Sequence, residues 1–216
     1  MTGYVEANVD DNGVAHYSFP DDVAWDNIEI KPTTRQIAEQ IDCICFGSLA
    51  QRSRASRETI LEFIGLTRPD TLKIFDLNIR QEFYSKEIVS SSLELADVLK
   101  LNDEELEIVT GLFTLSGGEN ERIDMLKEMF SLRGVVLTKG ADGSVIHFEN
   151  EKSEYTGSPV NVVDTIGAGD SFTASVAVGL LSGRSLDEIN RHANLVASYV
   201  CGKKGAMVNM PGSLKY

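Results

Sequence analysis

Long hydrophobic runs are absent from this chain of 216 residues. A membrane-spanning helix needs about 20 consecutive, predominantly apolar residues, and no segment of the sequence approaches that length. The first residues, MTGYVE, also lack the basic and apolar regions of a secretory signal peptide. We therefore expect a cytoplasmic protein that has no membrane as a partner.

Cysteine is scarce, with three residues in the whole chain: Cys43, Cys45 and Cys201. So small and odd a number argues against a disulfide framework. Cys43 and Cys45 are spaced to put both thiols on one face of a strand, and we interpret them as two small buried hydrophobic residues. A zinc site would need further ligands nearby, and the histidines are scattered along the sequence.

Positive charge is also in deficit, and the net charge is −13. So acidic a chain repels nucleic acid, which we therefore do not expect as a partner. The hydrophobic content of 42% and the charged content of 25% are ordinary for a globular protein. Any phosphate that this protein binds must be held by local groups that overcome the overall charge.

Strand patterns and helix patterns alternate along most of the chain, which indicates a largely parallel sheet with helices on both faces. In such sheets, ligands bind at the carboxyl ends of the strands. The strands are predicted at residues 41–46 (a buried strand), 72–76, 98–101, 135–138 and 144–148. The helices are predicted at residues 32–40, 56–66, 81–94, 119–132, 170–182 and 187–201, with another beginning at residue 103.

The N-terminal residues have a different pattern. Two short strand-like runs, residues 4–9 and 14–19, are joined by DDNG at residues 10–13. Asn-Gly between such runs is a strong signal for a β-hairpin. Since a hairpin closes locally, it does not fit the middle of a parallel sheet. We expect residues 1–25 to form an appendage beside an α/β domain of residues 26–216.

The segment DTIGAGD, residues 164–170, follows an apolar run and opens a predicted helix. Small residues let the backbone approach a ligand closely, and the free amides of a helix N-terminus attract anions. The segment is no Walker A loop, because no Gly-Lys-Ser/Thr follows. Asp170 beside a phosphate site suggests a proton acceptor, although it could equally be a simple N-cap.

Three further polar motifs follow predicted strands, and each has a purely structural alternative. Asn102 and Glu105 have the spacing of a capping box. The segment TKGADG, residues 138–143, could be a plain turn between two strands. Asp76 could cap the next element and pair with Arg80.

Taken in order, the four motifs resemble the ribokinase-like carbohydrate kinases, also called the phosphofructokinase-B family. They are DLNIR at 76–80, NDEE at 102–105, TKGADG at 138–143 and DTIGAGDSF at 164–172. The segment DVAWD, residues 22–26, looks most like fructokinases. The resemblance implies a ribokinase-like, doubly wound α/β fold with a mostly parallel sheet and a partial β lid at the N-terminus. It also implies an ATP-dependent phosphotransferase that uses Mg²⁺.

The resemblance also implies roles for individual residues. Asp170 would be the general base, and Gly167, Ala168 and Gly169 would form the anion hole for the transferred phosphoryl group. Asn102 and Glu105 would act on Mg²⁺ and phosphate, with Glu105 as the metal-side residue. Asp164 would help to hold a monovalent cation such as K⁺. The nucleotide would lie along Thr138, Gly140 and Gly143, with Asn194 and the 201–209 loop near adenine, and with Asp76, Asn78 and Arg80 orienting the phosphates.

The beginning of the chain departs from the family pattern, because the first strands and the sugar-contacting motifs of the family have no counterpart. We therefore expect a truncated kinase that keeps a nucleotide site and phosphorylates sugar poorly or not at all. Fructose is the favoured substrate, with ribose, 2-keto-3-deoxygluconate and a nucleoside as alternatives. A non-catalytic nucleotide-binding module is the alternative from another class. In the complete protein, the lid favours a homodimer.

Overall fold

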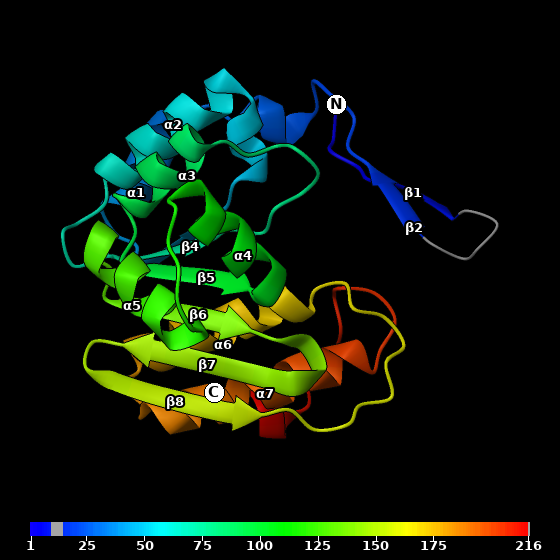
Figure 1. Ribbon diagram of the computed structural model, residues 1–216. Helices are drawn as coiled ribbons and strands as arrows, with labels where there is room; N and C mark the ends of the chain where they lie inside the picture. Colours follow the sequence, from blue (N-terminus) through cyan, green and yellow to red (C-terminus); the bar gives the residue numbers. More distant parts are fainter. Residues whose placement is uncertain (10–14, 216) are drawn as a thin grey trace.

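The protein is an α/β structure built on a six-stranded, mostly parallel sheet in the order β3-β4-β5-β6-β7-β8, with a separate two-stranded sheet β1-β2 (Figure 1). The computed structural model describes residues 1–9 and 15–215. The strands are β1 (Glu6–Val9), β2 (Ala15–Ser18), β3 (Cys43–Phe46), β4 (Leu72–Asp76), β5 (Val98–Asn102), β6 (Gly134–Thr138), β7 (Gly143–Phe148) and β8 (Glu151–Thr156). The α-helices are α1 (Pro32–Ala38), α2 (Arg54–Gly65), α3 (Lys86–Leu93), α4 (Asp103–Leu112), α5 (Glu119–Phe130), α6 (Ala168–Leu181) and α7 (Leu186–Cys201).

The large sheet has a parallel part and an antiparallel part. Strands β3 to β6 run parallel, each reached through at least one helix, and β7 and β8 then pair antiparallel through short connections. The predicted strand–helix alternation is confirmed, but β8 was not predicted. Its sequence, EKSEYT, is polar, and only Ser153 among its side chains is buried, because the strand lies at the edge of the sheet.

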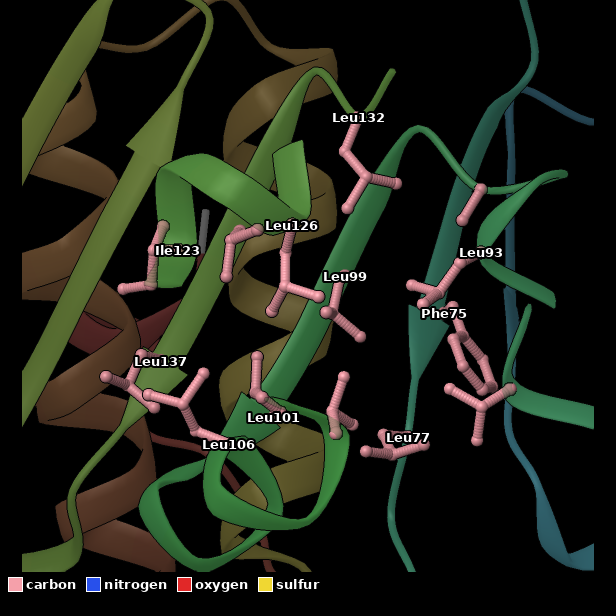
Figure 2. Packing of buried hydrophobic residues seen from close by; sticks show 14 of the residues in the cluster. Phe75, Leu77, Leu93, Leu99, Leu101, Leu106, Ile123, Leu126, Leu132 and Leu137 are labelled. Atoms are coloured by element: carbon pink, nitrogen blue, oxygen red, sulfur yellow. The ribbon is translucent and has the colours of Figure 1, made fainter. Parts of the chain in front are cut away.

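Two apolar clusters cover the two faces of the sheet. Strand residues alternate between them, as the period of two in a β-strand requires. In Figure 2, Phe75, Leu99, Leu101 and Leu137 point from neighbouring strands into the first cluster, which α2 to α5 cover. Helices α6 and α7 cover the opposite face through a second cluster that includes Ile74, Val98, Phe172, Val176, Ile189 and Ala193.

Strand β3 lies at the other edge of the sheet, and this position overturns two predictions. Residues 41–46 are not a buried strand, because Phe46 alone among the four residues of β3 is fully buried. Cys43 is half-buried and Cys45 is exposed, since no described strand covers the outer side of β3. The thiols do lie on one face: a hydrogen bond between them raises the pKa of Cys43 and lowers the pKa of Cys45.

A largely apolar groove of about 520 Å³ runs beside this edge. Its apolar wall is formed by side chains of β3, of α2 and of the segments that flank them, among them Ile28, Ile44, Phe46, Ile60 and Phe63. Parallel strands are usually buried on both faces. The groove therefore marks a part of the sheet, at β3, that the described residues leave partly uncovered.

The β1-β2 hairpin pairs antiparallel and projects from the main body (Figure 1). The turn that was predicted at residues 10–13 lies outside the described residues. The segment that follows β2 is anchored by Arg52, which is almost buried and pairs with Asp26 at 2.8 Å. No helix in the described part of the chain is long and apolar enough to cross a membrane.

Candidate active site

The predicted motifs meet at the carboxyl ends of β4, β5 and β6. The strand register makes Asp76 the neighbour of Lys100 and makes Asn102 the neighbour of Thr138. These residues are far apart in the sequence, and parallel pairing brings them to one edge of the sheet. The residues predicted at the strand ends therefore lie close together in space.

The first turn of α6 lies against this cluster. Gly167 is the N-cap, with φ of 81°, a conformation that disfavours a side chain. A Cβ at this residue would also lie 2.9 Å from Ala206, so the close approach of the 202–209 loop favours glycine. Asp170 is the third residue of the helix and is exposed, so the alternative interpretation of Asp170 as the N-cap is wrong.

The carboxylate of Asp164 accepts hydrogen bonds from two segments, the turn before α6 and the loop that follows α7. Its Oδ1 accepts the Ile166 amide at 3.0 Å, and its Oδ2 accepts the Gly205 amide at 2.9 Å. These backbone hydrogen bonds hold the pKa of Asp164 below its ordinary value. The carboxylate therefore links the turn before α6 to the C-terminal loop, and its assignment to a monovalent cation remains a prediction.

We expect Asp164→Asn to lower the free energy of unfolding at neutral pH. A carboxyl group with a depressed pKa stabilises the fold above its unfolded-state pKa of about 4, and this stabilisation is lost as the pH falls through the folded-state value. The difference between wild type and variant should therefore shrink below pH of about 4. Urea unfolding at a series of pH values measures it, and a gap that stays constant with pH would contradict the explanation.

Asn102 and Glu105 form the capping box that their spacing predicts. Asn102 Oδ1 accepts the Glu105 amide at 2.8 Å, and Glu105 Oε2 accepts the Asn102 amide at 2.9 Å. The other oxygen of Glu105 accepts the Ile79 amide at 2.7 Å, which joins the loop after β4 to α4. Glu105 is buried, so its structural role is established and its action on Mg²⁺ remains a prediction.

The segment predicted to lie along the nucleotide is a tight connection between β6 and β7. Gly143 has φ of 99°, and a Cβ there would lie 2.0 Å from the Tyr155 carbonyl oxygen, so this residue must be glycine. The next residue, Ser144, meets α7: its hydroxyl donates to Asn190 Oδ1 at 2.5 Å and accepts from Asn194 Nδ2 at 2.6 Å. Asn194 therefore lies beside Ser144, the residue of β7 that pairs with Thr138 at the end of β6.

The motif after β4 does not form the Asp76–Arg80 pair that was its purely structural alternative. Asp76 pairs with Lys100 at 3.0 Å and not with Arg80. Arg80 is exposed, and its guanidinium donates to the Ile79 carbonyl. Asn78 has φ of 43° and lines the apolar groove beside β3. No role was predicted for Lys100 from the sequence, although a lysine two residues after Val98 in an otherwise apolar run was a signal for one.

Comparison with known proteins identifies the family of this chain. The sequence pattern described as pfkB family carbohydrate kinase matches residues 4–212. The chain belongs to the pfkB family. A putative sugar kinase of Pyrococcus horikoshii is 30% identical over 194 residues, which cover 86% of this chain and 58% of that protein. A fructokinase of Escherichia coli is 34% identical over 149 residues, which cover 63% of this chain and 47% of that protein.

Solved structures of a sugar kinase and of a ribokinase show the same fold. The crystal structure of the Pyrococcus horikoshii sugar kinase in complex with ATP superposes with a TM-score of 0.77 at 27% identity, covering 95% of this chain and 66% of that chain. The ribokinase of Thermotoga maritima superposes with a TM-score of 0.69 at 20% identity, covering 95% and 65%. The chain thus spans less than two thirds of the length of these relatives.

Proposed function

We propose that this chain carries the nucleotide site and the phosphoryl-transfer residues of an ATP-dependent sugar kinase, with fructose as the favoured acceptor. The observation that supports it most is the first turn of α6, where an exposed Asp170 opens a helix that packs against Asp76 of β4 and Lys100 of β5. Membership of the pfkB family supports the reaction class. The resemblance to fructokinases supports the acceptor.

In the proposed reaction, the sugar hydroxyl oxygen bonds to the γ-phosphorus of ATP while the bond from that phosphorus to the β–γ bridging oxygen breaks. ADP leaves, and the hydroxyl proton passes to Asp170. The Gly169 amide receives a negative oxygen of the transferred group, whereas the Ala168 amide already donates to the Thr165 carbonyl. Since the transition state for phosphoryl transfer is loose, positioning and charge stabilisation supply most of the catalysis.

The residues present fit a Mg²⁺ ion that is held mainly by phosphates and water. The structure places no three His, Cys, Asp or Glu side chains together as a metal cage within its described residues, and Mg²⁺ in nucleotide sites usually has few protein ligands. Both oxygens of Glu105 accept backbone amides, so Glu105 would act through coordinated water. The ion would neutralise charge on the nucleotide phosphates.

A non-catalytic nucleotide-binding module is the second candidate. The apolar groove beside β3 favours it, because it leaves uncovered the side of the sheet next to the proposed site. A coupled assay of ADP release with MgATP, with and without fructose, separates the two functions. We expect fructose-dependent release from a kinase. Calorimetric binding of an ATP analogue, with no sugar-dependent release for fructose, ribose or 2-keto-3-deoxygluconate, would instead support the module.

A further inference from the structure

A buried lysine lies against the first turn of α6. The side chain of Lys100 is 8% exposed, and its Nζ donates to Asp76 Oδ1 at 3.0 Å. A Cβ at Gly169 would lie 3.3 Å from this Nζ. The ammonium group is therefore packed beside the second residue of the helix, at a position where any larger residue would crowd it.

This placement is unfavourable for the helix taken alone. The N-terminus of a helix carries a partial positive charge, so a nearby cation is repelled and a nearby anion is attracted. Burial adds a desolvation cost for the ammonium group. The Asp76 carboxylate balances one unit of charge. The amides of α6 and the lysine still act together on any group that binds at the helix end.

A second contact fixes the geometry. The hydroxyl of Thr173, one turn further along α6, donates to the other oxygen of Asp76 at 2.7 Å. Asp76 therefore bridges Lys100 on β5 and Thr173 on α6, and its side chain is only 13% exposed. Because each oxygen of the carboxylate accepts one of these hydrogen bonds, Asp76 holds Lys100 in a fixed position relative to α6.

We propose that Lys100 supplies positive charge to the phosphate site at the first turn of α6, and that Asp76 and Thr173 are positioning residues that hold it there. This inference rests on the proposed function and adds to it a residue that determines affinity for phosphate groups. The role assigned to Asp76 changes accordingly: it acts on the nucleotide phosphates through Lys100. Lys100 should therefore affect triphosphate binding and leave recognition of the nucleoside part unchanged.

The test compares the binding of ATP and of adenosine by calorimetry. We expect Lys100→Met to weaken ATP binding by roughly tenfold to a hundredfold, the size of a lost interaction with a charged group. Adenosine binding should change by less than about threefold, within the scatter of a neutral surface change. Lys73→Met is the matched control, because Lys73 lies on β4 and donates to the Thr71 carbonyl, away from α6.

Asp76→Asn distinguishes the charge of Lys100 from a structural role of the ion pair, because this variant removes the carboxylate and keeps the lysine. Since the asparagine oxygen can still accept from Lys100, this variant should retain or increase the preference for ATP over adenosine. A purely structural ion pair predicts instead that Lys100→Met and Asp76→Asn weaken both ligands together, and that result overturns the inference. If Lys100→Met does not fold, Lys100→Gln makes the same comparison, since its amide can still donate to Asp76.

The outcomes separate this inference from the proposed function. If wild type binds ATP and Lys100→Met binds it equally well, the role of Lys100 is wrong and the kinase assignment stands. If wild type binds no ATP, the proposed function and this inference fail together. Selective loss of ATP binding in Lys100→Met supports both.

Discussion

Asp170→Asn should lower the sugar-dependent turnover of this chain, which we expect to be slow, by about a hundredfold to ten-thousandfold, the usual contribution of a general base. The carboxylate stands exposed at the third position of α6, next to the Gly169 amide that would receive the transferred phosphoryl group. Asparagine keeps the size of the side chain and removes its ability to take a proton. The affinity for ATP should not fall, because the substitution removes a negative charge from a phosphate site.

The measurements are kcat from coupled ADP release and the dissociation constant of ATP from calorimetry. Glu121→Gln is a matched control, because Glu121 is also an exposed carboxylate at the third position of a helix, on α5, where it accepts the Gly118 amide. The control should turn over at the wild-type rate. Undiminished turnover in Asp170→Asn would show that another group takes the proton.

Phe75→Ala should lower the free energy of unfolding by about 3 to 5 kcal/mol, the range for removing a buried aromatic side chain. Phe75 is completely buried, and its ring stacks on Phe46 with centroids 5.2 Å apart. The substitution removes apolar burial and leaves a cavity between β3, β4 and the helices above them. A loss of this size is a large fraction of the roughly 5 to 15 kcal/mol that stabilises a typical domain.

Urea unfolding followed by circular dichroism measures this effect, and Met129→Ala on α5 is the control. Met129 is 49% exposed, so its substitution should stay within about 0.5 kcal/mol of wild type. A loss below about 1 kcal/mol for Phe75→Ala would mean that the site collapses around the smaller side chain. Phe75 precedes Asp76 on β4, so the same variant should also loosen the Asp76–Lys100 pair.

Local features were predictable from the sequence because neighbouring residues determine them. The capping box of Asn102 and Glu105 depends on a spacing of three residues, and the structure forms it as predicted. Strand β4 has the predicted bounds of residues 72–76. The glycine turn before α6 follows from the conformational freedom of Gly167. The four motifs also identified the family, which the comparison confirms.

Other features depend on contacts that no local pattern specifies. The exposure of Cys45 follows from the edge position of β3, and an apolar strand looks the same in sequence at the edge or in the middle of a sheet. The polar sequence of β8 becomes a strand only because β7 offers it a ladder of hydrogen bonds.

The clearest case is the cluster below α6. Lys100 and Asp76 are separated by 24 residues, and Thr173 and Asp76 by 97. The sequence by itself determined the family, the alternation of strands and helices, and the turn that carries Asp170. Only the tertiary structure placed a buried ammonium group beside that turn, because parallel strand register and helix packing decide which distant side chains share one face of the sheet.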